Sequence, residues 1–170
     1  CSITTGFAGA GAFSDGKLSL SPDVGGNLPE ILGYDRTIEL LKESDDIYLK
    51  FGADEKVYGI DEAEEIASIR KKAIQANLKL IECPIRHLGT EEGYKIYSRL
   101  QEHLLNEGVD MIFDTMVKDI IIEDGVAKGV VTDKGETYTA DEIVAAVGRE
   151  GSEWLSGICR KYDIETQVGT

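Results

Sequence analysis

The feature that most constrains the fold is one stretch of sheet-forming sequence, MVKDIIIEDGVAKGVVTDKGETYTADEIVAAVG, at residues 116–148. Two runs rich in β-branched residues are joined by Asp124-Gly125, and a second turn at residues 133–135 leads into a third short run. Asp-Gly between such runs is the strongest short-range signal for a β-hairpin. The stretch therefore predicts a three-stranded antiparallel meander.

Apolar runs lie on both sides of this meander. VDMIFDT (109–115) precedes the meander, and EIVAAVG (142–148) follows it. A continuously apolar run is typical of a strand that is buried on both faces of a parallel sheet. These runs predict two strands of a parallel sheet with the meander as the connection between them, which is an α/β architecture.

The region before residue 90 is mostly helical in pattern. The pattern of residues 28–51 predicts helix with a turn near LGYD. A second helix is predicted to begin near Asp61 and Glu64, which resemble a capping box, and to end at about Ala76. LKLIECPIRHL (78–88) reads as a strand broken by its proline. We expect a mostly helical insertion here.

Two further helices flank the sheet-forming stretch. Thr90 is placed to cap the first of them, and Gly108 can take the left-handed position after its last turn. The second helix is expected to begin at Ser152 and to turn Trp154 and Ile158 inward.

Composition excludes several classes of partner. Thirty-two acidic against eighteen basic side chains give a net charge of −14, which repels nucleic acid and anionic membranes. No apolar run reaches membrane-spanning length. Cys1, Cys83 and Cys159 are too far apart for a metal or redox motif. We therefore expect a cytoplasmic protein with no metal site and with neither nucleic acid nor membrane as a partner.

The chain opens with a glycine-rich loop, CSITTGFAGAGAFSDGKLSL. Glycine permits close approach of the backbone to a ligand, and backbone N–H groups can hold an anion without side-chain charge. One interpretation of residues 6–17 is thus a ligand-facing loop. The other is a surface loop with no ligand.

The segment from Val109 to Gly148 resembles the middle of an FAD-binding domain of the glutathione-reductase type. In that family a parallel strand leads into a three-stranded meander, which returns through an acidic residue to a strand ending in small residues and glycine. Here these parts are VDMIFDT, the meander, Asp141 and EIVAAVG. The resemblance implies a partial FAD/NAD(P)-binding nucleotide fold with a mostly helical insertion.

Three further stretches, GFAGAGAFSDGKLSLSPDVGG (6–26), RHLGT (86–90) and AVGREGSEWL (146–155), together resemble a group of bacterial FAD-dependent dehydrogenases. In such flavoproteins the glycine-rich loop runs along the flavin and its diphosphate. The resemblance implies FAD as the cofactor. The cofactor-binding residues that it implies are Gly6, Gly9, Gly11, Ser14, Asp15, Gly16, Lys17, Val117, Gly148 and Arg149.

Three of these positions have specific implied roles. Val117 matches the family position whose backbone brackets the adenine edge, and Gly148 matches the small residue that lets the cofactor pass. Arg149 could face diphosphate or substrate. Each position also has an alternative interpretation. Val117 could be an ordinary core valine of a strand, Gly148 could lie in an ordinary strand-to-helix turn, and Arg149 could form a surface ion pair.

Arg86 and His87 are the candidates for chemistry at a small-molecule substrate. A guanidinium can clamp a carboxylate, and an imidazole can move protons near neutral pH. Neighbours in an extended segment point to opposite faces, so we do not expect both to act on the same atom. The alternative for His87 is a structural role.

The chain departs from the family in lacking the G-x-G-x-x-G turn, the acidic residue that binds the ribose hydroxyls, and the C-terminal Gly-Asp element. We therefore expect a middle piece of an FAD-dependent oxidoreductase that is inactive alone and that self-associates through uncovered sheet edges. The alternative is a non-catalytic α/β binding or interaction module. The predicted division is a cofactor-facing loop (1–26), the helical insertion or part of a substrate domain (27–85), the centre of the FAD-binding domain (86–150), and a helix beginning the next segment (151–170).

Overall fold

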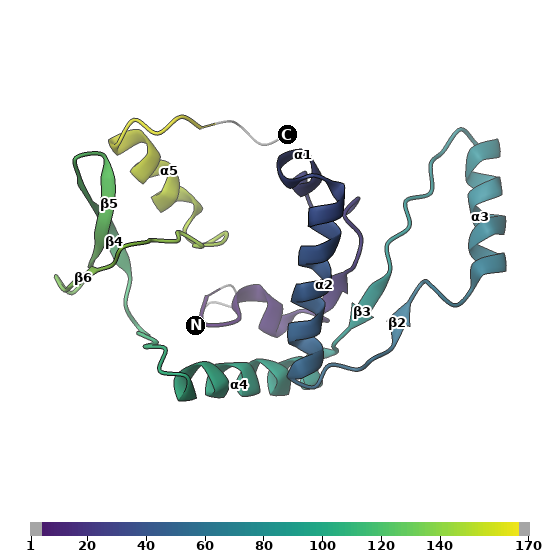
Figure 1. Cartoon of the computed structure of the whole chain (residues 1–170), viewed down its shortest axis with the longest axis horizontal. Coiled ribbons are helices and arrows are strands. Elements are labelled where there is room, and N and C mark those ends of the chain that lie inside the picture. Colours follow the sequence, from purple (N-terminus) through teal and green to yellow (C-terminus); the bar gives the residue numbers. More distant parts are fainter. Residues whose placement is uncertain (1–4, 167–170) are drawn as a thin grey trace. The chain divides into compact units, whose positions relative to one another are not determined.

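The computed structural model describes residues 5–166 and shows a mixed α/β protein, as predicted (Figure 1). Its residues cluster into two units. Within the described residues, the meander unit comprises residues 5–9 and 109–166, and the helical unit comprises residues 10–108. The short 3-10 helix η1 (Gly9–Phe13) spans the boundary. The functional division at residues 26, 85 and 150 stays a prediction.

The meander unit contains the predicted three-stranded sheet. Strands β4 (Val117–Glu123), β5 (Val126–Thr132) and β6 (Thr137–Thr139) pair antiparallel in the order β4-β5-β6. Asp124 and Gly125 have φ angles of 51° and 78°, the left-handed conformation that a two-residue hairpin turn requires. The hairpin prediction is confirmed, because the turn chemistry is local and needs no distant partner.

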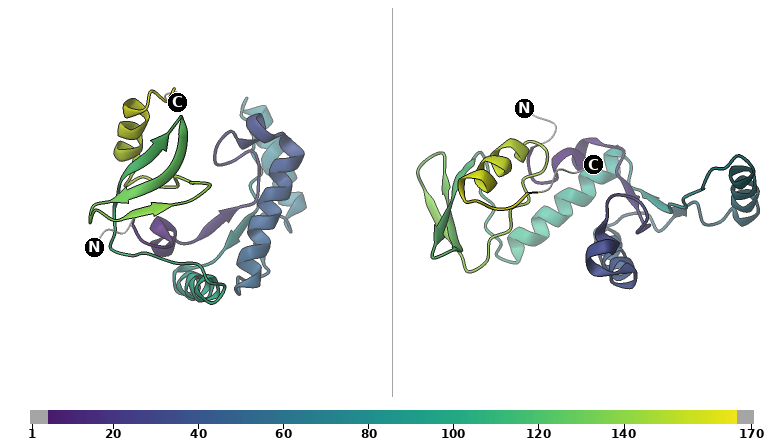
Figure 2. Two further views of the ribbon diagram at one scale, coloured as in Figure 1. Left: turned by 60° about the vertical axis from the view of Figure 1, so that its left-hand side comes forward. Right: turned by 90° about the horizontal axis from the view of Figure 1, so that it is seen from above.

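Helix α5 (Ser152–Lys161) lies beside this sheet (Figure 2). Ile158 is its buried residue, at 5% exposure. Two aromatic side chains at and just after the helix bind the backbone of β4: the Trp154 indole N–H donates to the carbonyl of Lys118 at 3.0 Å, and the Tyr162 hydroxyl donates to that of Ile120 at 2.7 Å. These carbonyls belong to an edge strand, so the two side chains cover part of an edge that would otherwise be open.

The two predicted parallel strands are not formed. Residues 109–115 and 142–148 have no ladder with any strand in residues 5–166. A strand needs a neighbour to bind its N–H and C=O groups, and an apolar run without one stays irregular. Several of their apolar side chains are consequently exposed, Val144 most of all at 87%.

The helical unit is built around α1 (Leu28–Leu32), α2 (Tyr34–Lys50) and α4 (Thr90–Asn106). Gly33 separates α1 from α2, as the LGYD turn predicts. Ala53, Leu88 and Ile96 form a small core, against which Leu18, Tyr48, Leu49 and Phe51 pack. Gly108 follows α4 with a φ of 84°, which confirms its predicted left-handed position.

A second three-stranded sheet lies in the helical unit. Strands β1 (Lys17–Ser19), β3 (Ile85–His87) and β2 (Val57–Tyr58) pair antiparallel in the order β1-β3-β2. The strand expected over 78–88 is thus only three residues long and begins directly after Pro84. Proline lacks the N–H that a ladder needs.

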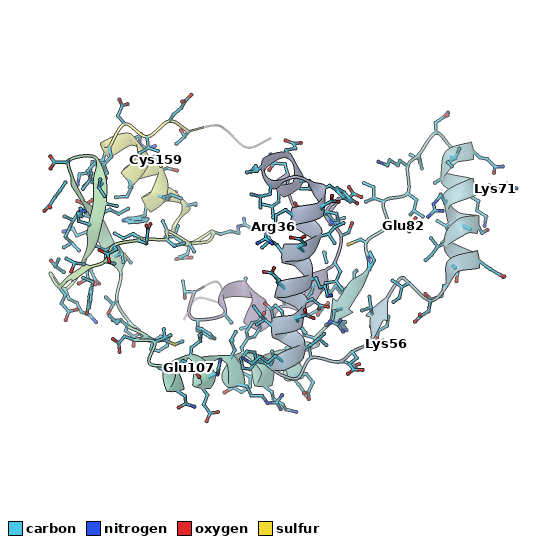
Figure 3. The ribbon with its side chains drawn as sticks, in the orientation of Figure 1. Arg36, Lys56, Lys71, Glu82, Glu107 and Cys159 are labelled. Atoms are coloured by element: carbon cyan, nitrogen blue, oxygen red, sulfur yellow. The ribbon has the colours of Figure 1, made fainter. Side chains whose placement is uncertain are left out.

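Helix α3 (Ala63–Gln75) buries none of its residues. Among its apolar residues, Ile66 and Ala73 are half-buried, while Ile69 is exposed. Figure 3 shows Lys71 extending from this helix, and Lys71 is exposed. No helix in residues 5–166 combines the length and apolar character needed to cross a membrane.

The predicted helix caps are wrong in detail. Asp61, Thr90 and Ser152 are not the N-cap residues; those positions belong to Glu62, Gly89 and Gly151, and none makes a side-chain capping hydrogen bond. Thr90 and Ser152 are instead the first residues of their helices. A capping hydroxyl must precede the first helical residue, so a one-residue shift removes the interaction.

Candidate functional site

The meander unit contains a groove of about 540 Å³. Three segments line it: the loop at residues 5–9, residues 115–117 at the start of β4, and residues 146–151, which lead into α5. Trp154 from the first turn of α5 completes the wall. Segments more than 100 positions apart in the sequence thus face one space.

A second lobe of about 840 Å³ continues this groove. Both lobes are lined by Thr5, Gly6, Phe7, Thr115 and Met116. The second lobe extends along residues 111–114 and reaches Asp133 in the β5–β6 turn. The two lobes together form one elongated space.

Hydrogen bonds fix the entry to β4, which forms one wall of the groove. The backbone N–H of Met116 donates to the Asp133 carboxylate at 3.1 Å, and the N–H of Asp133 donates to the carbonyl of Met116 at 2.8 Å. The Lys134 ammonium donates to the Thr115 hydroxyl at 3.0 Å. The β5–β6 turn therefore holds residues 115 and 116 in place.

Two glycines open the groove to a ligand. Gly6 (φ 99°) and Gly148 (φ 60°) take backbone conformations that favour glycine, and a Cβ at either would meet no atom within 4 Å. The space beside them is groove rather than protein. An aromatic or ribose group could therefore approach the backbone closely at both positions.

Among the described residues, the charged side chains that line the groove are all acidic: Asp114, Asp133 and Glu150. Lys134 contacts Thr115 at the rim and is the basic group that these hydrogen bonds bring nearest. Such a lining disfavours a cluster of phosphates and suits the neutral rings of a dinucleotide. Within residues 5–166, no three His, Cys, Asp or Glu side chains gather as metal ligands.

The structure brings four of the predicted cofactor-binding residues together in this groove: Gly6, Gly9, Val117 and Gly148. Arg149 stands between two lining residues without lining the groove itself. The juxtaposition of the four was expected from the family resemblance alone. Their cofactor-binding role stays a prediction.

The other five predicted cofactor-binding residues, Gly11, Ser14, Asp15, Gly16 and Lys17, belong to the helical unit. A Cβ at Gly11 would lie 3.0 Å from the Tyr97 hydroxyl, and one at Gly16 would lie 2.8 Å from Cβ of Leu88. Asp15 and Lys17 form an exposed ion pair at 3.3 Å. The Ser14 hydroxyl accepts the N–H of Gly16 at 3.0 Å. Each therefore has a structural use there.

Arg86 also has a structural use. It is 4% exposed, and its guanidinium donates to both carboxylate oxygens of Asp45 at 2.5 and 2.7 Å and to the carbonyl of Asp54. The hydrogen bond to Asp45 raises the pKa of Arg86, so the buried group stays charged. His87 points to the opposite, exposed side of β3. Their catalytic roles stay predictions.

Phe7, Met116 and Trp154 line the groove but were not among the predicted site residues. The sequence held one signal for Trp154, since it was expected to turn inward at the start of a helix that follows Gly148. Phe7 lies between the two predicted glycines Gly6 and Gly9. Nothing in the sequence indicated Met116.

The fold and the groove define an α/β protein with an open, glycine-walled cleft beside a β-meander. Residues 57–168 match the family model for pyridine nucleotide-disulphide oxidoreductases, and the chain belongs to that family. Its members bind FAD or NAD(P), so this is a flavin- or pyridine-nucleotide-dependent oxidoreductase domain. No curated protein matches the chain.

Proposed function

We propose that the chain forms part of an FAD-dependent dehydrogenase of the bacterial type, which passes hydride between a small-molecule substrate and the flavin. The observation that carries this proposal is the groove that joins Gly6, Gly9, Val117 and Gly148. These residues come from three distant segments and share an implied role at FAD. We place the enzyme in the cytoplasm, in keeping with the free thiols of Cys83 and Cys159; Cys1 lies outside the described residues.

Each wall of the groove has a task in this proposal. Gly6 and Gly148 let the cofactor approach the backbone, and Met116 and Trp154 keep water from its rings. Residues 6–8 of the glycine-rich loop contribute backbone N–H groups, which bind a diphosphate without adding positive charge; the N–H of Gly9 already donates to the carbonyl of Gly6. The flavin, when bound, supplies the hydride chemistry, while the protein supplies placement and electrostatics.

The test is a titration of the chain with FAD, followed residue by residue through backbone amide NMR signals. Because weak binding also shifts such signals, the titration does not depend on high affinity. We expect saturable shifts at Gly6, Val117 and Gly148. Gly33 and Gly52 in the helical unit are matched controls and should not shift.

Two outcomes would contradict the proposal. Shifts confined to the helical unit would place any nucleotide site away from the groove. The absence of saturable shifts at millimolar FAD would favour the alternative, a non-catalytic binding or interaction module. Dehydrogenase turnover is not expected from this chain alone, so activity is not the readout.

A further inference from the structure

Trp154 is one of the groove-lining residues to which the family resemblance gives no role. It is the single tryptophan of the chain, and it lies in the first turn of α5. Its side chain is half-buried and lines the groove together with Val117 and Gly148. An indole at this place presents a large aromatic surface beside the predicted adenine position.

The orientation of this side chain is fixed. The indole N–H donates to the carbonyl of Lys118 at 3.0 Å, and Lys118 directly follows Val117 in β4. The same bond therefore ties α5 to the strand backbone one residue from Val117. Trp154 both forms a wall and positions the backbone next to it.

The charge of the groove indicates that a neutral ring rather than a phosphate lies against this wall. The charged lining is acidic, whereas adenine is neutral and carries an exocyclic amine that donates hydrogen bonds. Stacking of a base on an aromatic side chain acts between ring faces and needs no basic side chain. A neutral aromatic ring suits this wall, and a phosphate does not. The implied role of Val117, which lines the groove together with Trp154, favours adenine over the flavin ring.

We propose that Trp154 makes the groove selective for adenine-bearing nucleotides, by stacking on the adenine and by holding the β4 backbone beside Val117. This inference rests on the proposed function and adds the residue that sets its ligand preference. It concerns the adenine half of the cofactor only. The flavin half lies elsewhere along the groove and gains nothing from Trp154.

Tyr162 provides a matched control. Its hydroxyl donates to the carbonyl of Ile120 at 2.7 Å, so it makes the same kind of bond to the same strand. Tyr162 does not line the groove. Tyr162→Phe therefore removes a comparable bond between the α5 region and β4 without touching the site.

The experiment measures the affinity of FAD and of FMN, which lacks adenine, for the wild-type chain and for Trp154→Ala, Trp154→Phe and Tyr162→Phe. We expect Trp154→Ala to weaken FAD binding by about 5- to 150-fold, the range for loss of one stacked base. Trp154→Phe keeps a ring but loses the N–H, and we expect a loss of about 2- to 12-fold. FMN binding should be unchanged in every variant, and Tyr162→Phe should bind FAD like the wild type.

The outcomes separate this inference from the proposed function. If the wild-type chain binds no FAD, the proposed function fails and this inference fails with it. If the wild type binds FAD while both Trp154 variants bind it within twofold of Tyr162→Phe, only the inference is overturned. An equal loss of FAD and FMN affinity also overturns it, because a general packing defect does not distinguish them. If Trp154→Ala does not fold, the comparison of FAD affinity between Trp154→Phe and Tyr162→Phe decides.

Discussion

The two units use glycine in opposite ways. In the helical unit Gly11 and Gly16 are crowded, since an added Cβ would lie 3.0 Å from Tyr97 and 2.8 Å from Leu88. In the meander unit Gly6 and Gly148 face open space. One glycine-rich loop thus serves two purposes, packing in its later part and an open groove wall in its earlier part. Glycine content alone does not locate a site; the surroundings of each glycine do.

The ion pairs of the two units also differ in how far they are buried. Arg86 and Asp45 in the helical unit are 5% and 12% exposed at their side chains, whereas Lys161 and Asp119 in the meander unit are 51% and 33% exposed. Water screens the second pair and not the first. Loss of one partner should therefore destabilise the helical unit more than the corresponding loss destabilises the meander unit.

The largest expected effect comes from removing the buried pair. Arg86→Ala leaves the Asp45 carboxylate buried without its partner, and such a change costs about 3–5 kcal/mol of unfolding free energy. Urea unfolding followed by circular dichroism at 222 nm measures it, since α2 and α4 supply much of that signal.

Arg36→Ala is the control for this experiment. Arg36 lies on α2 (Figure 3) and makes exposed pairs with Glu39 and Glu43. Exposed pairs contribute little to stability, so we expect a much smaller loss than for Arg86→Ala. Equal losses for the two variants would show that burial of the Arg86 pair does not matter, and the contrast between the units would fail.

The next effect tests whether Gly16 is a packing glycine. Gly16→Ala combines a φ of 64° with a Cβ that would lie 2.8 Å from Leu88, so we expect a loss of about 2–4 kcal/mol. Gly108→Ala is the control in the same unit, because Gly108 has a left-handed φ of 84° and open space around it. It should lose only the strain, about 1 kcal/mol. Urea midpoints of the two variants decide, and a smaller loss for Gly16→Ala than for Gly108→Ala would contradict the crowding.

A smaller stability effect, but a specific binding effect, is expected at Gly148. Gly148→Ala adds a methyl group to the groove wall at a φ of 60°, and the strain costs about 1 kcal/mol. Gly135→Ala in the β5–β6 turn has the same strain at a φ of 81° and does not line the groove. Both variants should lose similar stability, but only Gly148→Ala should weaken FAD binding, by about tenfold. Equal FAD affinity in a calorimetric titration would remove Gly148 from the site.

The features that the sequence predicted well are those decided by neighbours in the chain. The hairpin at Asp124-Gly125, the break at Gly33 and the end of α4 at Gly108 each depend on a few adjacent residues. Residues 109–115 and 142–148 were predicted as strands from their apolar character, but strand formation depends on a pairing partner that composition does not supply.

In the candidate site, too, some features could be predicted from the sequence, and others depend on contacts between distant residues. Gly6, Val117 and Gly148 could be assigned to one groove because the family resemblance fixes their order along the fold. The crowding of Gly16 by Leu88 could not be predicted, since it arises from contact between β1 and the end of β3, about 70 positions apart. The wall formed by Trp154 likewise depends on how α5 lies beside β4.

The smallest expected effect is a change in the pH dependence of stability that comes from the exposed pair Lys161–Asp119. The hydrogen bond from Lys161 is the main cause that lowers the pKa of Asp119 below its usual 3.8. As the pH falls below 3.8, the unfolded chain takes up this proton before the folded one does, so the stabilisation from the pair is lost. Asp119→Asn removes the titrating group, and its unfolding midpoint should fall less than that of the wild type between pH 5 and pH 3. High salt should shrink the difference, because both partners are partly exposed. Identical pH dependence in the two proteins at low salt would show that Asp119 titrates as it does in the unfolded chain.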